Sequence, residues 1–250
     1  MNDTTQVIVL SQMDYKENDA LIKVFSYDYG LMTFLAKGIR KINSKNRSIC
    51  MPYSISEFMF NYHESSQIQS LLQGQIIQSH HKIHEDLTKS GTASLCVELV
   101  ESLIHDESEN DILIEHFEFT KFLLEQIEEK SKMNAILAFM LSSYMNYYGI
   151  SPHVDSCVLC DSTKINSISI EEGGLICNEC QAEIHSPIYT VEFLKEFRLS
   201  QRINKDNFEN YLNYKDVSNE LILLLVKFLE YHTGVTLKSW EFIRKWSIMM

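Results

Sequence analysis

Hydrophobic and polar side chains alternate at every second position in the first 80 residues. The alternation recurs in five stretches, carried by Val7 and Val9, Ile22 and Val24, Met32 to Ala36, Phe58 to Tyr62, and Gln67 to Gln78. A period of two is typical of β-strands with one buried face. Tyr29-Gly30 marks a turn, and Gly74 interrupts the last stretch in the manner of a bulge or barrel bend. Five short strands with one long connection, Gly38 to Pro52, predict a small closed barrel such as the OB fold.

Beyond about residue 79 the hydrophobic period becomes that of an α-helix. The apolar stripes are Leu95, Leu99 and Leu103; Leu113, Phe117, Thr120, Leu124 and Ile127; Met133, Ile136, Leu137, Met140, Leu141 and Tyr144; and Val217, Leu221, Leu224, Leu225 and Phe228. Such stripes are usually core. Gly149 is expected to cap the third stripe. The chain is therefore predicted to be α+β, with a barrel domain at 1–80 and a helical domain at 81–250.

Four cysteines in the helical region form two C-x-x-C pairs. Cys157 and Cys160 are followed by Cys177 and Cys180, with 16 residues between the pairs. This spacing predicts a zinc site, because each turn can aim two sulfurs at one point and Zn²⁺ favours a tetrahedron of thiolates. We expect one structural Zn²⁺ per chain.

The residues between the two pairs predict a β-hairpin. Its strands are Ile168 to Glu171 and Leu175-Ile176, closed by a two-residue glycine turn at Gly173-Gly174. The hairpin and the cysteines together predict a zinc ribbon-like finger at 150–187, inserted in the helical domain.

Paired cysteines also occur in two other kinds of site. A thioredoxin-like redox pair needs one C-x-x-C beside a βαβ unit, and that pattern is absent. A zinc hydrolase or deaminase needs an open coordination position, whereas four thiolates close the shell. His153 and His185 flank the cluster as alternative ligands, although ordinary surface histidines explain them more simply. Cys50 and Cys96 stand alone and are expected to be buried apolar side chains.

Charge is distributed unevenly along the chain. Its 250 residues include 22 Lys and Arg against 34 Asp and Glu, a net charge of −12. That balance argues against a surface that binds nucleic acid everywhere, because phosphates repel it. Residues 1–80 hold seven of each sign, so the negative excess lies after residue 80. Any site for a polyanion is therefore expected in the first third.

The long connection of the predicted barrel is basic. Its cations are Lys37, Arg40, Lys41, Lys45 and Arg47, with no acidic residue among them. Such a loop can track phosphates, while the barrel aromatics Phe34, Phe58 or Tyr53 are candidates to stack on bases. A solvated loop that keeps an acidic protein soluble is the alternative, given equal weight.

Several features predict a cytoplasmic protein without a membrane anchor. The densest apolar run, Leu221 to Val226, stops at Lys227, and Asp3 and Asp14 lie where a signal peptide would be basic and then apolar. Six cysteines are too few for a disulfide-stapled secreted scaffold.

The predicted barrel and the cysteine region both resemble a known family. The matching residues are Val9-Leu10-Ser11, Asp14-Tyr15, Glu17, Asp19, Phe25, Tyr29-Gly30, Ala36-Lys37-Gly38, Arg40-Lys41, Gly173-Gly174, Ile176-Cys177, Cys180 and Leu237-Lys238-Ser239. At these positions the chain resembles the DNA repair protein RecO family, and its cysteine region resembles the zinc-bearing branch.

The resemblance implies a mediator of DNA repair and homologous recombination. Members bind single- and double-stranded DNA through an OB-fold domain, promote annealing, and act with RecR to load RecA on strands coated by single-stranded-DNA-binding protein. The family's basic positions fall on Lys37, Arg40 and Lys41, and Lys16 stands where a glycine is usual. The loop departs from the family at Ile42 to Ser44, where proline and further basic residues are common, and the helical part is unusually acidic.

No catalytic constellation stands out in the sequence. A nucleophile with a placed base, a phosphate-binding glycine loop and a carboxylate metal cluster are all lacking, so an enzyme is the least favoured class, and no small-molecule substrate is expected. The alternative to a DNA-binding mediator is an acidic adaptor that binds only proteins, with a structural zinc site and no direct DNA contact.

Overall fold

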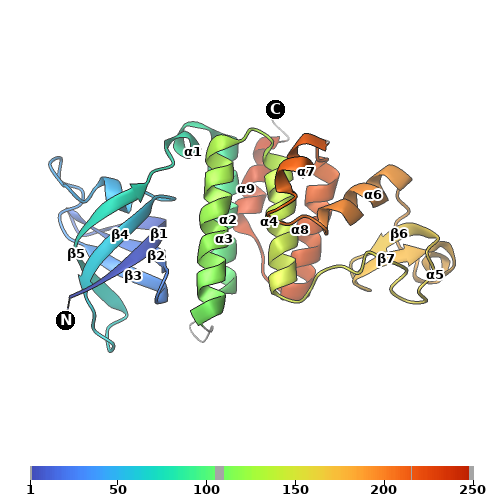
Figure 1. Cartoon of the computed structure of the whole chain (residues 1–250), viewed down its shortest axis with the longest axis horizontal. Coiled ribbons are helices and arrows are strands. Elements are labelled where there is room, and N and C mark those ends of the chain that lie inside the picture. The colour runs from blue at the N-terminus through green and yellow to red at the C-terminus, as the bar shows by residue number, and fades with distance from the viewer. Residues whose placement is uncertain (1, 105–109, 215, 248–250) are drawn as a thin grey trace. The chain divides into compact units, whose positions relative to one another are not determined.

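The computed structural model describes residues 2–104, 110–214 and 216–247 (Figure 1). The chain forms two compact units, Met1–Glu129 and Lys130–Met250. None of the helices within the described ranges is both long and apolar enough to cross a membrane.

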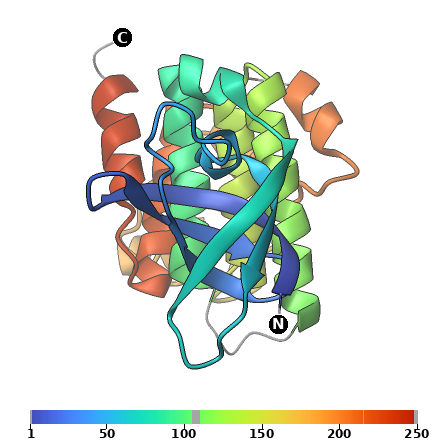
Figure 2. The ribbon, with the colours of Figure 1, turned by 90° about the vertical axis from the view of Figure 1, so that its left-hand side faces the viewer.

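The first unit begins with a five-stranded closed barrel (Figure 2). Its strands are β1 (Asn2–Tyr15), β2 (Asp19–Ser26), β3 (Gly30–Ala36), β4 (Ile55–Asn61) and β5 (Ile68–Gln78), with a short 3₁₀ helix, η1 (Ser48–Cys50), in the long connection. The strand order is β1-β2-β3-β5-β4, and β3 pairs with β5 in parallel. The predicted barrel is confirmed.

Aromatic rings fill the barrel interior. Phe34 packs edge-on against Phe58 and Phe60, with ring centroids 5.3 and 5.1 Å apart, and all three rings are fully buried. Gly74 pairs with Phe58, and a Cβ at this glycine would overlap the carbonyl oxygen of Glu57. Glycine is therefore required by close backbone approach, while the bulges of this strand pair lie on either side of it.

Three helices complete the first unit: α1 (His81–Glu85), α2 (Leu87–Leu103) and α3 (Asn110–Glu129). The carboxylate of Asp86 caps α2 by accepting the N–H groups of Thr88 and Lys89. Every residue of the predicted α3 stripe is buried. In the α2 stripe Leu95 and Leu99 are buried, whereas the side chain of Leu103 lies outside the part that the structure describes.

The second unit combines helices with a small hairpin. Its elements are α4 (Met133–Tyr147), β6 (Ile165–Ser169), β7 (Gly174–Cys177), α5 (Asn178–Ile184), α6 (Val191–Ser200), α7 (Phe208–Tyr214), α8 (Asn219–Thr233) and α9 (Lys238–Ser247). Gly149 follows α4 with φ +65°, in the capping conformation expected of it. Val217 is buried but precedes α8, because the hydroxyl of Ser218 caps this helix by accepting the N–H of Leu221.

Candidate metal centre and nucleic-acid interface

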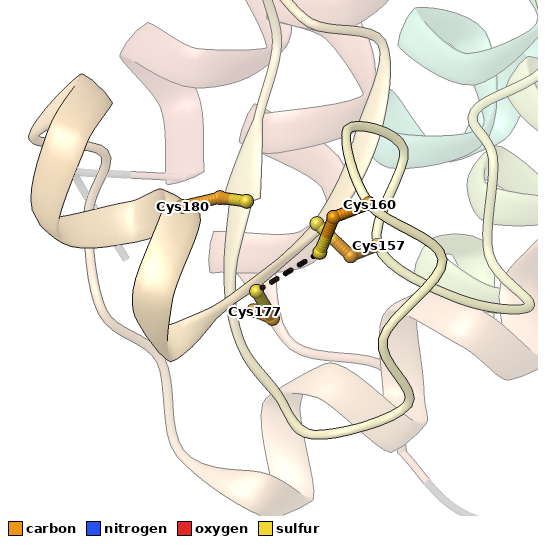
Figure 3. A group of neighbouring side chains, drawn as sticks. All are labelled: Cys157, Cys160, Cys177 and Cys180. Atoms are coloured by element: carbon orange, nitrogen blue, oxygen red, sulfur yellow. Dashed lines mark hydrogen bonds between the residues drawn. The ribbon is translucent and has the colours of Figure 1, made fainter.

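The four cysteines of the finger converge on one point (Figure 3). Their Sγ atoms all lie within 4.8 Å of one another, and Cys160 Sγ lies 3.5 Å from Cys177 Sγ. A tetrahedral ion with Zn–S bonds of ~2.3 Å separates its sulfurs by about 3.8 Å. The cluster therefore matches the size of a four-thiolate metal site.

Local backbone geometry places each pair of sulfurs. The N–H of Asp161 donates to the carbonyl of Cys157 at 2.9 Å, which closes a tight turn, and Asp161 itself adopts φ +60°. Cys177 ends β7 and Cys180 lies in the first turn of α5, so one strand-to-helix junction presents the second pair. Each C-x-x-C pair therefore lies at a bend in the chain.

The environment of Cys157 favours a thiolate, the form that binds metals. Burial raises the pKa of this thiol, but the backbone N–H groups of Cys177, Leu159 and Cys160 outweigh it and lower the pKa to about 7. Cys50 and Cys96 behave in the opposite way, since burial raises the pKa of both thiols to about 12. They are buried and outside the cluster, as predicted.

The hairpin differs from the sequence prediction in its turn. The strands are joined by a four-residue turn, Ile170 to Gly173, in which the N–H of Gly173 donates to the carbonyl of Ile170 at 3.2 Å. The predicted two-residue turn was wrong because Gly174 belongs to β7. A Cβ at Gly174 would overlap the carbonyl oxygen of His153, and the N–H of Leu175 donates to that same oxygen at 2.9 Å. Gly174 thus serves a close backbone approach, which the sequence pattern did not reveal.

Neither flanking histidine joins the cysteine cluster. His153 is exposed, and its Nε2 lies 3.0 Å from the hydroxyl of Ser156. His185 is exposed at the left-handed C-cap of α5, with Nδ1 3.1 Å from the carbonyl oxygen of Glu183. Among the described residues, the metal-binding group contains the four cysteines and no histidine.

Three of the predicted basic residues surround an open depression on the barrel. The depression has a volume of about 420 Å³ and is lined by Lys16, Glu17, Asn18, Asp19, Lys37, Gly38 and Lys41. Two hydrogen bonds join its walls: the N–H of Gly38 donates to Asp19 Oδ1 at 2.8 Å, and the N–H of Arg40 donates to the carbonyl of Asn18 at 3.1 Å. The β1–β2 turn and the loop after β3 therefore form one connected surface.

Other basic residues of the barrel domain do not line the depression. Arg40 is exposed but pairs with Asp14 at 3.1 Å, while Lys45 and Arg47 are exposed farther along the loop and do not line the depression. Lys23, on β2, pairs with Glu101 of α2 at 3.3 Å. This neutralisation by a helical carboxylate has no signal in the local sequence.

Two of the three aromatic residues suggested as base-stacking groups lie inside the barrel. Phe34 and Phe58 are fully buried in the barrel, so the prediction that they contact bases was wrong. Tyr53 is half-buried, its hydroxyl lies 2.9 Å from that of Ser94, and its ring stacks on His84. Alternation along a strand predicts that one face is apolar, but it does not say whether that face lines the barrel interior or lies on the outside.

Comparison with known proteins settles the family. A family model described as "Recombination protein O N terminal" matches residues 1–80, and one described as "Recombination protein O C terminal" matches residues 84–241. The chain belongs to the recombination protein O (RecO) family. The first RecO match covers the barrel, and the second covers helices α2 to α8 and the finger.

Curated relatives agree over nearly the whole chain. A "DNA repair protein RecO" of Halalkalibacterium halodurans is 25% identical over 238 residues, covering 94% of this chain and 92% of the relative. Proteins of the same name from Alkaliphilus metalliredigens and Listeria monocytogenes serotype 4a are 26% and 24% identical, with coverage of 94% and 97% of this chain and 91% and 95% of theirs. The protein is thus a DNA repair protein of the RecO family.

Proposed function

We propose that the protein is a recombination mediator that binds single- and double-stranded DNA, promotes annealing, and acts with RecR to load RecA on strands coated by single-stranded-DNA-binding protein. The observation that carries the proposal is the depression lined by Lys16, Lys37 and Lys41 on a RecO-type barrel. Its three ammonium groups outnumber the carboxylates of Glu17 and Asp19 that also line it, and this excess suits a phosphate backbone.

The division of labour follows the two family matches. We infer that residues 1–80 hold DNA, and that the helical domain at 81–250, with a structural Zn²⁺ in the finger at 150–187, presents surfaces to partner proteins. Cys157, Cys160, Cys177 and Cys180 would complete the ion's coordination shell and leave no position for a substrate. We therefore propose a binding protein without catalytic activity, which works in the cytoplasm where its DNA is.

The competing hypothesis is an acidic adaptor that binds only proteins, and the net charge of −12 favours it. A fluorescence titration of the full chain with labelled single strands and duplexes, with and without RecR, distinguishes the two. We expect binding that weakens as salt rises, because phosphate contacts release counterions. Absence of binding to either DNA in both arms would leave the adaptor as the better hypothesis.

Asp14 is expected to restrain DNA binding. Its carboxylate pairs with Arg40 at 3.1 Å, so a phosphate must compete with it for the guanidinium. Replacing Asp14→Asn removes the competing charge and should strengthen single-strand binding by about 1.4- to 5-fold, the range of one exposed charge pair. The slope of log affinity against log salt should steepen by roughly 0.7, the value for one further phosphate contact.

The matched control for this variant is Asp206→Asn, an exposed carboxylate of the second unit. It removes the same charge far along the chain from the barrel and should leave both quantities unchanged. Equal strengthening by the two variants would mean that only net charge matters and that Arg40 has no particular role.

A further inference from the structure

We propose that Tyr15, supported by Met13, is a base-stacking platform that makes the barrel prefer single-stranded over double-stranded DNA. This inference rests on the proposed function, since it assigns a specificity residue to the same surface. It takes the role suggested for Phe34 and Phe58, which are fully buried in the barrel.

Strand register places the two side chains on the outer face of the barrel. Tyr15 pairs with Asp19 and Met13 pairs with Leu21, and directly paired residues of antiparallel strands project to the same face. The neighbour of Leu21 along β2, Ile22, is fully buried in the core, so Leu21 and its partner Met13 point outward. The outer face of an OB barrel beside its first turn is a common position for oligonucleotides.

The helices of the same unit cover only part of this face. Farther along β2, Phe25 is buried against Phe117 of α3, with ring centroids 5.6 Å apart, and Lys23 pairs with Glu101 of α2. At the C-terminal end of β1, Met13 is 62% exposed and Tyr15 is 39% exposed. Within the first unit, the open end of the face is therefore the end that carries Tyr15.

Tyr15 also adjoins the cationic depression. The next residue, Lys16, lines the depression, and its Nζ lies over one face of the Tyr15 ring, 5.2 Å from the centroid, so the face left for a base is the opposite one. Asp19, the strand partner of Tyr15, forms another part of the wall and fixes Gly38 through its carboxylate. A base on the ring would thus leave its phosphate beside Lys16 and the other lysines of the depression.

This arrangement discriminates by exposure of the base. In a single strand a base can leave its neighbours and stack on an aromatic ring, whereas in a duplex both faces of the base are already stacked. Phosphate contacts are available in both forms. Tyr15 should therefore add affinity for single strands alone, and this added affinity should not depend on salt.

The test compares Tyr15→Ala and Tyr15→Phe in the full chain, with labelled oligo-dT and a duplex of the same length as probes. Tyr15→Ala should weaken oligo-dT binding by roughly 5- to 100-fold, the range for loss of one base–aromatic stack, with the duplex affinity and the salt slope unchanged. Tyr15→Phe should restore single-strand binding, because the ring is retained. Tyr231→Ala, a 58% exposed tyrosine of α8, is the matched control and should bind both probes like the parent.

A second measurement reports contact directly. When the protein is irradiated in complex with oligo-dT that carries 5-iododeoxyuridine, the oligonucleotide should crosslink to Tyr15. Mass spectrometry of the digested complex locates the crosslink. Unchanged oligo-dT binding by Tyr15→Ala, or an equal loss for duplex and single strand, would overturn the platform. If the parent binds DNA through the depression lysines and Tyr15→Ala leaves the affinity unchanged, only this inference fails. If the parent binds neither probe, the proposed function fails as well.

Discussion

Replacing Cys177 and Cys180 with serine is expected to reduce bound zinc from about one ion per chain to none and to unfold the finger. The finger has little else to stabilise it. Its apolar cluster centres on Cys157, Ile176 and Cys177, and two of these three belong to the four-cysteine cluster. A segment of under ~40 residues seldom folds without metals or disulfides, whereas structural zinc contributes ~10–16 kcal/mol in isolated fingers. No contact of the described hairpin approaches that energy.

Elemental analysis of undialysed protein measures the metal, and hydrogen exchange with peptide resolution measures the fold. Amides in 150–187 should lose protection in the variant, while those of the barrel strands keep it, since β1 to β5 form their own closed core. A strong chelator should reproduce the same pattern in the parent protein.

Two kinds of control accompany the cysteine variant. Cys96→Ala removes a buried cysteine outside the cluster and should keep the zinc. His153→Ala with His185→Ala tests the flanking histidines and should also keep it. Full zinc content in the double-serine variant, or a metal-free parent with a protected finger, would contradict a structural zinc site on these four sulfurs.

Replacing Lys16, Lys37 and Lys41 with alanine should weaken single-strand binding by roughly 10²-fold at 0.1 M salt. Each lysine lost removes one phosphate contact and its counterion release, so the slope of log affinity against log salt should fall by about 2. The three side chains are exposed and line one depression, and none belongs to the barrel core. The fold should therefore persist, as checked by thermal unfolding.

A matched variant separates the site from overall charge. Lys164→Ala, Lys195→Ala and Lys227→Ala together remove three exposed positive charges from the second unit. This variant carries the same net charge as the first and should retain parental affinity and salt slope. If both variants lose binding equally, DNA is attracted by net charge alone and the depression is not its site.

The sequence predicted the barrel because its signals are local. Alternation at Ile22 and Phe34 marks strand faces that must be buried, and a strand slipped by one residue would expose all of them. The α3 stripe from Leu113 to Ile127 is equally local, and each of its residues is buried as expected. Short elements such as α1 and α7 escaped prediction, because one or two helical turns do not establish a period.

The cysteine cluster was predictable to its four members, since C-x-x-C spacing and thiolate chemistry are typical of a closed metal shell. The turn of the hairpin was not, because Gly174 could serve a turn or a close approach equally well. Only the position of His153, more than 20 residues earlier, shows that it serves the approach.

By itself the sequence determined the barrel strands, the long helical stripes and the four cysteines that cluster, because those features depend on neighbours a few positions away. Tertiary structure alone decided which cations face one depression and which are neutralised by Asp14 or Glu101, and it left Tyr15 39% exposed beside that depression. Charge pairing and exposure are set by residues that are distant along the chain and become neighbours only when the barrel closes and α2 and α3 pack against it.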